Sequence, residues 1–298
     1  GTREQILAQD PPVTLGEPFA FDMEKHAVFE AWGKTVADKF GLAKVHVGTL
    51  RFLDGKAYLV LNVVEQQDAA NHTFRAEPDK NIDVPEEVSA LLEKHSALIQ
   101  KNFDTQNFEA LREEVRGIEE KDYYNTYPDS EEMSALVDEM RATFPPHRQA
   151  LIEVLKHSRS TQARAHAATA LNWSGDVLDS ISQIYMLTDD PAVLVRNNIS
   201  RFMLHYLQYH PDKAVRGAVI DSLLVQMTFP SHADRNKALY GLLALAQSAP
   251  ADRGFIEQKG RAEIERIAKQ SILDNVGGVA KQLLDLFDQP ETKPVTNE

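Results

Sequence analysis

From Pro145 onward, apolar residues recur at the three- and four-residue spacing of amphipathic helices, and short polar breaks interrupt them. This pattern predicts eight helices and no strand in the second half of the chain. The helices are expected at residues 147–158, 161–173, 177–188, 192–209, 214–227, 233–246, 260–271 and 276–287. Eight helices in this order make four pairs.

The second helices of these pairs share one residue pattern. Arg164, Arg196 and Arg235 align, and in each helix a small or apolar residue follows after three positions and a large apolar one after seven. The residues at these two positions are Ala167, Ile199, Ala238 and Leu171, Met203, Leu242. Val276 takes the arginine position in the fourth unit, where a terminal repeat departs from the consensus. The spacing predicts helical pairs that stack because one pair cannot bury its apolar face alone.

The region over residues 145–288 resembles HEAT and armadillo repeats. In HEAT units an aspartate in the turn between the helices precedes a Val-Arg that opens the second helix, and Asp190 with Val195-Arg196 matches this pattern. Arg164 and Arg235 lack the aspartate six residues earlier, so the match is looser in the other units. The resemblance implies an α-solenoid, and an irregular helical bundle is the alternative.

We interpret the aspartate and the arginine as structural residues. An aspartate near a helix N-terminus accepts backbone N–H groups, and an arginine of the neighbouring unit can bridge to it.

The first half of the chain has a different pattern. Residues 44–53 and 56–65 are rich in β-branched and aromatic residues and flank Asp54-Gly55, which is typical of a tight hairpin. A third strand is expected at residues 72–77. A helix from Met23, capped by Asp22 and ended by Gly41, precedes the strands, and another runs from Val84 through Phe103.

The predicted fold is therefore an α+β N-terminal domain followed by an all-α, HEAT-like solenoid, in a predominantly helical chain. The acidic run that includes residues 107–120 predicts a bridging helix, and Asp129 or Ser130 is expected to cap the next one. The expected divisions are an extended lead-in over 1–18, a small α+β domain over 19–103, a helical linker over 104–144, the solenoid over 145–288 and a disordered tail over 289–298.

The charge distribution limits the partners of this protein. The chain has 298 residues and a net charge of −13. Residues 1–144 hold 15 Lys and Arg against 28 Asp and Glu, whereas residues 145–298 hold 17 of each. Neither half has the clustered basic surface that nucleic acid requires, so no nucleic-acid partner is expected. No apolar run is long enough to span a membrane.

Cysteine is absent, which removes disulfides, thiolate metal sites and cysteine nucleophiles. This composition suits an exported bacterial protein, although a cytosolic protein can also lack cysteine. The chain begins Gly-Thr-Arg, which either removal of a signal segment or a remnant of cloning would explain. We expect export, to the periplasm for instance.

The sequence carries no established catalytic or ligand-binding motif. His-Glu-x-x-His, Gly-x-Ser-x-Gly and the glycine-rich phosphate loops are all missing. We therefore predict no metal site, no cofactor and no catalytic residues.

A polar and aromatic stripe on the second helices is the candidate site. Positions two, five and nine after each aligned arginine share one helix face. In order they are His166, Thr169, Trp173; Asn198, Arg201, His205; and Lys237, Tyr240, Ala244. The resemblance implies that second helices line a concave groove, and such a stripe suits a protein or peptide segment. The leading hypothesis is a non-enzymatic binding scaffold, and the alternative for the stripe is a solvated face with Trp173 and Tyr240 tucked between units.

The alternative function is an enzyme or cofactor-handling protein on the same scaffold, similar to the HEAT-like bilin lyases. Its pocket would lie at the domain junction, with Tyr123, Tyr127 and His147. Fold analogy alone supports it. Packing at the junction explains the cluster of Tyr123, Tyr124 and Tyr127, and a partner-binding patch is the alternative, because tyrosine is enriched at interfaces.

Overall fold

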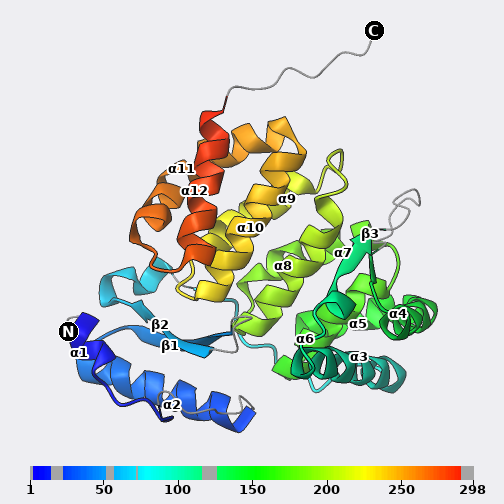
Figure 1. Cartoon of the computed structure of the whole chain (residues 1–298), viewed down its shortest axis with the longest axis horizontal. Coiled ribbons are helices and arrows are strands. Elements are labelled where there is room, and N and C mark those ends of the chain that lie inside the picture. The colour runs from blue at the N-terminus through cyan, green and yellow to red at the C-terminus, as the bar shows by residue number, and fades with distance from the viewer. Residues whose placement is uncertain (1–2, 15–22, 52–56, 72, 116–125, 290–298) are drawn as a thin grey trace.

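The computed structural model describes residues 3–14, 23–51, 57–71, 73–115 and 126–289. Within these residues the chain forms twelve α-helices and two two-stranded sheets (Figure 1). The protein is therefore predominantly helical, as predicted.

Helices and strands are mixed up to residue 143, and the regular elements described after it are helices. The first part comprises α1 (Arg3–Leu7), α2 (Met23–Phe40), β1 (Lys44–Arg51), β2 (Ala57–Val64), α3 (Glu86–Asp104), β3 (Glu113–Val115), β4 (Thr126–Pro128) and α4 (Glu131–Thr143). The second part comprises α5 (Arg148–His157), α6 (Thr161–Ala170), α7 (Val177–Ile184), α8 (Val193–Leu207), α9 (Arg216–Met227), α10 (His232–Ser248), α11 (Pro250–Gln270) and α12 (Asp274–Asp288).

The eight helices predicted after Pro145 are confirmed, although α6 and α7 end three and four residues earlier than expected and continue as 3₁₀ turns, and α11 is longer than expected. Helix α11 begins at Pro250, ten residues before its expected start. Proline is well suited to the first helical turn because its missing N–H has no partner there anyway. Ile256 is fully buried and anchors the added turns against the body of the protein.

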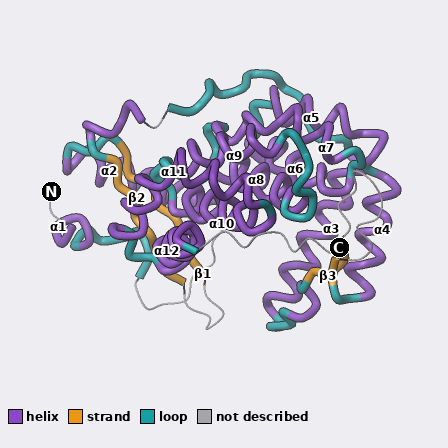
Figure 2. The backbone as a smooth tube through the Cα atoms, turned by 90° about the horizontal axis from the view of Figure 1, so that it is seen from above, coloured by secondary structure: helices purple, strands orange, loops and turns teal. Residues whose placement is uncertain are grey.

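The second helices contact one another in chain order. Helix α6 contacts α8, α8 contacts α10, and α10 contacts α12. Figure 2 shows this row crossing the molecule from above, and in Figure 1 α8, α10 and α12 lie side by side. The six residues three and seven positions after the aligned arginines all have 0% exposure: Ala167, Leu171, Ile199, Met203, Ala238 and Leu242. The apolar half of the repeated pattern is therefore the core, as predicted.

Buried arginine–aspartate pairs join consecutive second helices. Arg164 on α6 reaches Asp190 before α8, with Nε–Oδ2 at 3.0 Å and Nη2–Oδ1 at 3.1 Å. Asp190 also accepts the backbone N–H of Ala192 at 2.9 Å. Arg196 on α8 binds Asp234 in the first turn of α10 at 2.8 and 2.6 Å. The structural role inferred for the aspartate and the arginine is confirmed.

Strands β1 and β2 form the predicted antiparallel hairpin, with Lys44 opposite Val64 and Arg51 opposite Ala57. The Asp54-Gly55 turn lies outside the described residues, as does Asp22. Helix α2 packs on β1, and a Cβ at Gly33 would lie only 2.6 Å from the carbonyl oxygen of Val45. Gly41 ends α2 with a φ of 64°, as predicted.

The predicted third strand is wrong in its described part, residues 73–77. These residues begin a segment, here named the strap (residues 73–84), that crosses the helical body. The ring of Phe74 lies 4.9 Å from that of Phe229, and Arg75 forms an ion pair with Asp190. Lys80 donates its backbone N–H to His157 at 3.1 Å. Partners on the helices therefore replace a neighbouring strand.

Helix α3 was expected within the α+β domain over 19–103. Its buried residues Val88, Leu91 and Leu92 belong to the large helical core. The smaller core that includes Phe29 and Val45 joins α1, α2 and β1, and Leu59 and Leu61 of β2 pack against it. The packing of α3 is with α4 and α6.

Two further segments differ from expectation. The lead-in over 1–18 contains helix α1, and residues 109–115 of the linker form a 3₁₀ turn and β3 instead of a helix. Pairing with β4 therefore overrides the helix propensity of this run, which is rich in the good helix formers Glu, Ala, Leu and Arg. Ser130 caps α4 by accepting the N–H of Met133 at 3.5 Å, as predicted. Residues 290–298 of the expected tail lie outside the described residues.

Candidate partner-binding face

The α6 part of the predicted stripe is covered by α3. Trp173 is only 8% exposed, with its ring 5.2 Å from that of His95 and 6.3 Å from that of Phe144. His166 is partly buried, and burial lowers its pKa. Trp173 is thus a core residue that cannot present its ring to a partner. Sequence reasoning missed this because α3 comes from another part of the chain.

Thr169 and Asn198 hold α6 and α8 together. The side-chain amide of Asn198 donates to Thr169 Oγ1 at 3.1 Å and to the carbonyl oxygen of Ala165 at 3.1 Å. Both side chains are partly buried. Their polar atoms are therefore engaged within the protein.

The exposed part of the stripe lies on α8 and α10. Arg201 is exposed and Tyr240 is 49% exposed, whereas His205, Lys237 and Ala244 are partly buried. Within the described residues, neither Arg201 nor Lys237 has a hydrogen bond or an ion pair. By contrast, Arg164 and Arg196 form buried ion pairs with aspartates.

Burial and like charge shift the titration of this face. Burial lowers the pKa of His205 to about 4, and the charges of Arg201 and Lys237 add to the effect. Burial also lowers the pKa of Lys237 to about 8, helped by Arg201. At pH 7 His205 is therefore neutral, while Arg201 and Lys237 form an uncompensated cationic pair.

The face continues onto α12 by the same register. With Val276 in the arginine position, the second and fifth positions are Gly278 and Lys281. Lys281 is exposed, and a Cβ added at Gly278 would meet no atom within 4 Å. Among the described residues Lys281 too has no ion pair. The alignment of the fourth unit could have identified Lys281 from the sequence, because Lys281 holds the same position as Arg201.

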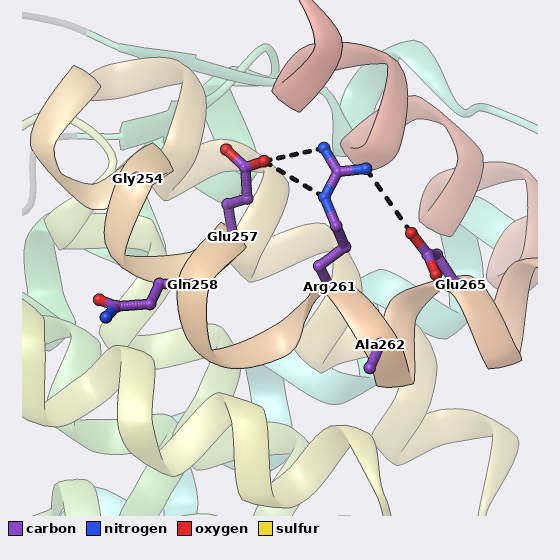
Figure 3. Close-up of a pocket in the computed structure, with 6 residues that line it drawn as sticks. All are labelled: Gly254, Glu257, Gln258, Arg261, Ala262 and Glu265. Atoms are coloured by element: carbon purple, nitrogen blue, oxygen red, sulfur yellow. Dashed lines mark hydrogen bonds and ion pairs between the residues drawn. The ribbon is translucent and has the colours of Figure 1, made fainter.

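A shallow hollow lies elsewhere, on α11 (Figure 3). Six residues of that one helix line it: Gly254, Glu257, Gln258, Arg261, Ala262 and Glu265. Arg261 donates to Glu257 at 2.8 Å and to Asp288 at 2.8 Å. Its charge is thus already satisfied, and one helix surface cannot enclose a ligand.

The residues considered for a junction pocket are only partly described. Tyr123 and Tyr124 lie outside the described residues. The Tyr127 hydroxyl is bonded by Arg141, whose guanidinium also stacks 4.1 Å from the ring centroid. His147 lies 2.5 Å from a carboxylate oxygen of Glu87. These contacts tie α4 and α3 to their neighbours.

Within the described residues no three His, Asp or Glu side chains are grouped to hold a metal ion. None of the described helices is long and apolar enough to cross a lipid bilayer. No family model, curated protein or solved structure matches this chain. Its function must therefore be inferred from the geometry of the molecule.

Proposed function

We propose that this protein is a non-enzymatic binding module, a short HEAT-like solenoid that holds a protein or peptide segment on its second helices. The open face comprises Arg201, Lys237, Tyr240 and Lys281 on α8, α10 and α12; we name it the α8–α12 face. The observation that carries the proposal is that these polar side chains have no hydrogen-bond or ion-pair partner among the residues that the structure describes.

Stacking supports the solenoid part of the proposal. Successive second helices contact in order, and buried arginine–aspartate pairs link α6 to α8 and α8 to α10. A stacked row of helices presents side chains at a constant spacing, which is the geometry that repeat proteins use for extended ligands. Two of the predicted site residues, His166 and Thr169, belong to the covered end of this row.

The contacts of the residues considered for catalysis favour a binding role over an enzymatic one. Tyr127 and His147, the described members of the proposed junction pocket, are engaged with Arg141 and Glu87. No observation on the described residues places an unengaged acid beside a base in a cavity. We retain protein binding as the single proposed function.

Photo-crosslinking from the face tests this proposal. A benzoylphenylalanine at Tyr240 is expected to crosslink a protein of the native lysate. The same group at Ile272, which is 73% exposed but lies between α11 and α12, serves as the matched control. Equal yields from both positions, or none from Tyr240, would refute the α8–α12 face as the binding site.

A further inference from the structure

The α8–α12 face carries positive charge on a protein whose net charge is −13. Three cations, Arg201, Lys237 and Lys281, occupy neighbouring units, and within the described residues none of them has an ion pair. On the neighbouring helices α9 and α11, Arg216 forms an ion pair with Asp252 at 2.7 Å, and Lys259 forms one with Asp221 at 2.7 Å. The three cations of this face therefore lack the ion pairs that Arg216 and Lys259 have.

A repeated contact places the three units in register. Asn198, two positions after its aligned arginine, reaches Thr169, five positions after the arginine of the preceding unit. Lys237 and Arg201 hold the same two positions one unit later, and the charge of Arg201 lowers the pKa of Lys237. The next step of this diagonal assigns the corresponding positions to Gly278 on α12 and Tyr240 on α10. Tyr240 is 49% exposed, and a Cβ added at Gly278 would meet no atom within 4 Å, so both positions are open.

This arrangement suits an anion attached to an apolar group. Lys237 is half-buried, so water screens its charge less than that of a surface lysine. A partly buried ammonium without a partner gains when a carboxylate arrives, because its desolvation has already occurred on folding. The ring of Tyr240 adds an apolar surface with a polar tip, the side chain enriched at protein interfaces.

We propose that the partner held by the α8–α12 face is an acidic peptide segment that sets carboxylates against Arg201 and Lys237 and an apolar side chain against Tyr240. This inference rests on the proposed function and specifies its ligand. A long polyanion such as RNA fits less well, since the described part of this face offers three cations and the net charge of the whole chain is −13. One acid, the exposed Asp285, lies on the same helix as Lys281 and limits the positive patch on that side.

Fluorescence anisotropy with two defined peptides tests the inference. The probe is a labelled twelve-residue peptide of alternating Glu and Leu, and its comparison is the same peptide with Gln for Glu. The full chain is expected to bind the Glu peptide at least about tenfold more tightly than the Gln peptide. The double variant R201E and K237E should lose this preference. Equal affinity for both peptides, or tighter binding of a single-stranded RNA than of the Glu peptide, would overturn the inference.

A charge-matched control separates local recognition from net charge. Arg159 and Lys269 are exposed and lie on other parts of the helical body, so R159E with K269E makes the same change in net charge. This control is expected to bind the Glu peptide like the wild type; a loss equal to that of the first double variant would refute local recognition.

The same variants distinguish the two proposals. Repeating the Tyr240 crosslink with R201E and K237E should abolish capture of the lysate partner. Undiminished capture would retain the binding function and reject its acidic ligand. If no partner crosslinks from Tyr240 at all, the binding function itself fails.

Discussion

Arg196 and Asp234 form a bidentate ion pair inside the helical body, with Nε–Oδ1 at 2.8 Å and Nη2–Oδ2 at 2.6 Å. Gln226 donates to the same carboxylate at 3.1 Å, and Ser200 donates to Gln226 at 2.7 Å. The arginine also stacks 4.3 Å from the ring centroid of Phe74 in the strap. One buried carboxylate thus holds α8, α9 and α10, and its arginine contacts the strap.

Replacing Asp234 by Asn should therefore destabilise the protein strongly. The change leaves Arg196 buried without its counter-charge, and breaking such a pair costs about 3–5 kcal/mol. Chemical denaturation measures the loss. The matched control is Asp221→Asn, which breaks an exposed pair with Lys259 and should cost less than about 1 kcal/mol. Similar losses for both variants would contradict the structural role of the buried pair.

The strap should loosen when Arg75 is replaced by Ala. Besides pairing with Asp190, Arg75 donates to the carbonyl oxygens of Leu155 at 3.1 Å and Lys156 at 3.3 Å. Loss of these charge-assisted bonds should cost about 2–3 kcal/mol and raise hydrogen exchange in residues 73–84. Arg112→Ala, which removes an exposed pair with Glu109, should change neither quantity. Unchanged exchange in the strap would show that Arg75 does not anchor it.

Alanine at two helical glycines should have opposite effects. A Cβ at Gly254 meets no atom within 4 Å, so Gly254→Ala should stabilise the protein by roughly 0.5–1 kcal/mol through helix propensity. At Gly241 the added carbon would lie 2.6 Å from Leu204, so Gly241→Ala should destabilise by about 1–3 kcal/mol. Melting temperatures of the two variants check the sign of each effect. A stabilising Gly241→Ala would mean that α8 and α10 pack more loosely than described.

Stability should fall as the solution becomes acidic. Burial lowers the pKa of His205 and of His232 to about 4 in the folded protein, from 6.5 when unfolded. For His232 the charge of His46 lowers it further and Asp234 opposes the shift. The stabilisation is therefore complete above pH 6.5 and is lost as the pH falls through 4. Each histidine should contribute roughly 1–2 kcal/mol to the loss between pH 7 and 5.

Denaturation at pH 7 and 5 measures this loss, and His232→Asn should reduce it. His157→Gln is the matched control, because the His157 side chain is 42% exposed and forms an ion pair with Glu153 at the surface. An unchanged loss in His232→Asn would show that His232 is not the titrating group.

Filling the space at Gly278 should block the α8–α12 face. A Cβ at Gly278 would meet no atom within 4 Å, so Gly278→Phe should add a ring to this face without a clash. Affinity for the Glu-Leu peptide should then fall at least about tenfold, while the melting temperature stays within a few degrees. Gly254→Phe on α11 is the control of equal size. Unchanged affinity in Gly278→Phe would place the ligand away from α12.

Local periodicity in the sequence determined the eight helices after Pro145, the core residues of the second helices and the β1–β2 hairpin. These features depend on spacing along one segment, and the burial of Ile199 and Met203 follows from it. The structural role of Asp190 could be predicted for the same reason, because the arginine position with which it pairs repeats along the chain.

The tertiary structure alone decided which distant segments complete this scaffold. Asp234 replaces the missing turn aspartate from within α10, the strap brings Arg75 to Asp190, and α3 covers Trp173. Arg196 and Asp234 are 38 positions apart along the chain, and Arg75 and Asp190 are 115 positions apart. No repeating pattern in the sequence records such distant contacts. The sequence thus specified a polar stripe on three helices. Packing of α3 covers the α6 end of this stripe, and within the described chain its exposed residues lie on α8 and α10.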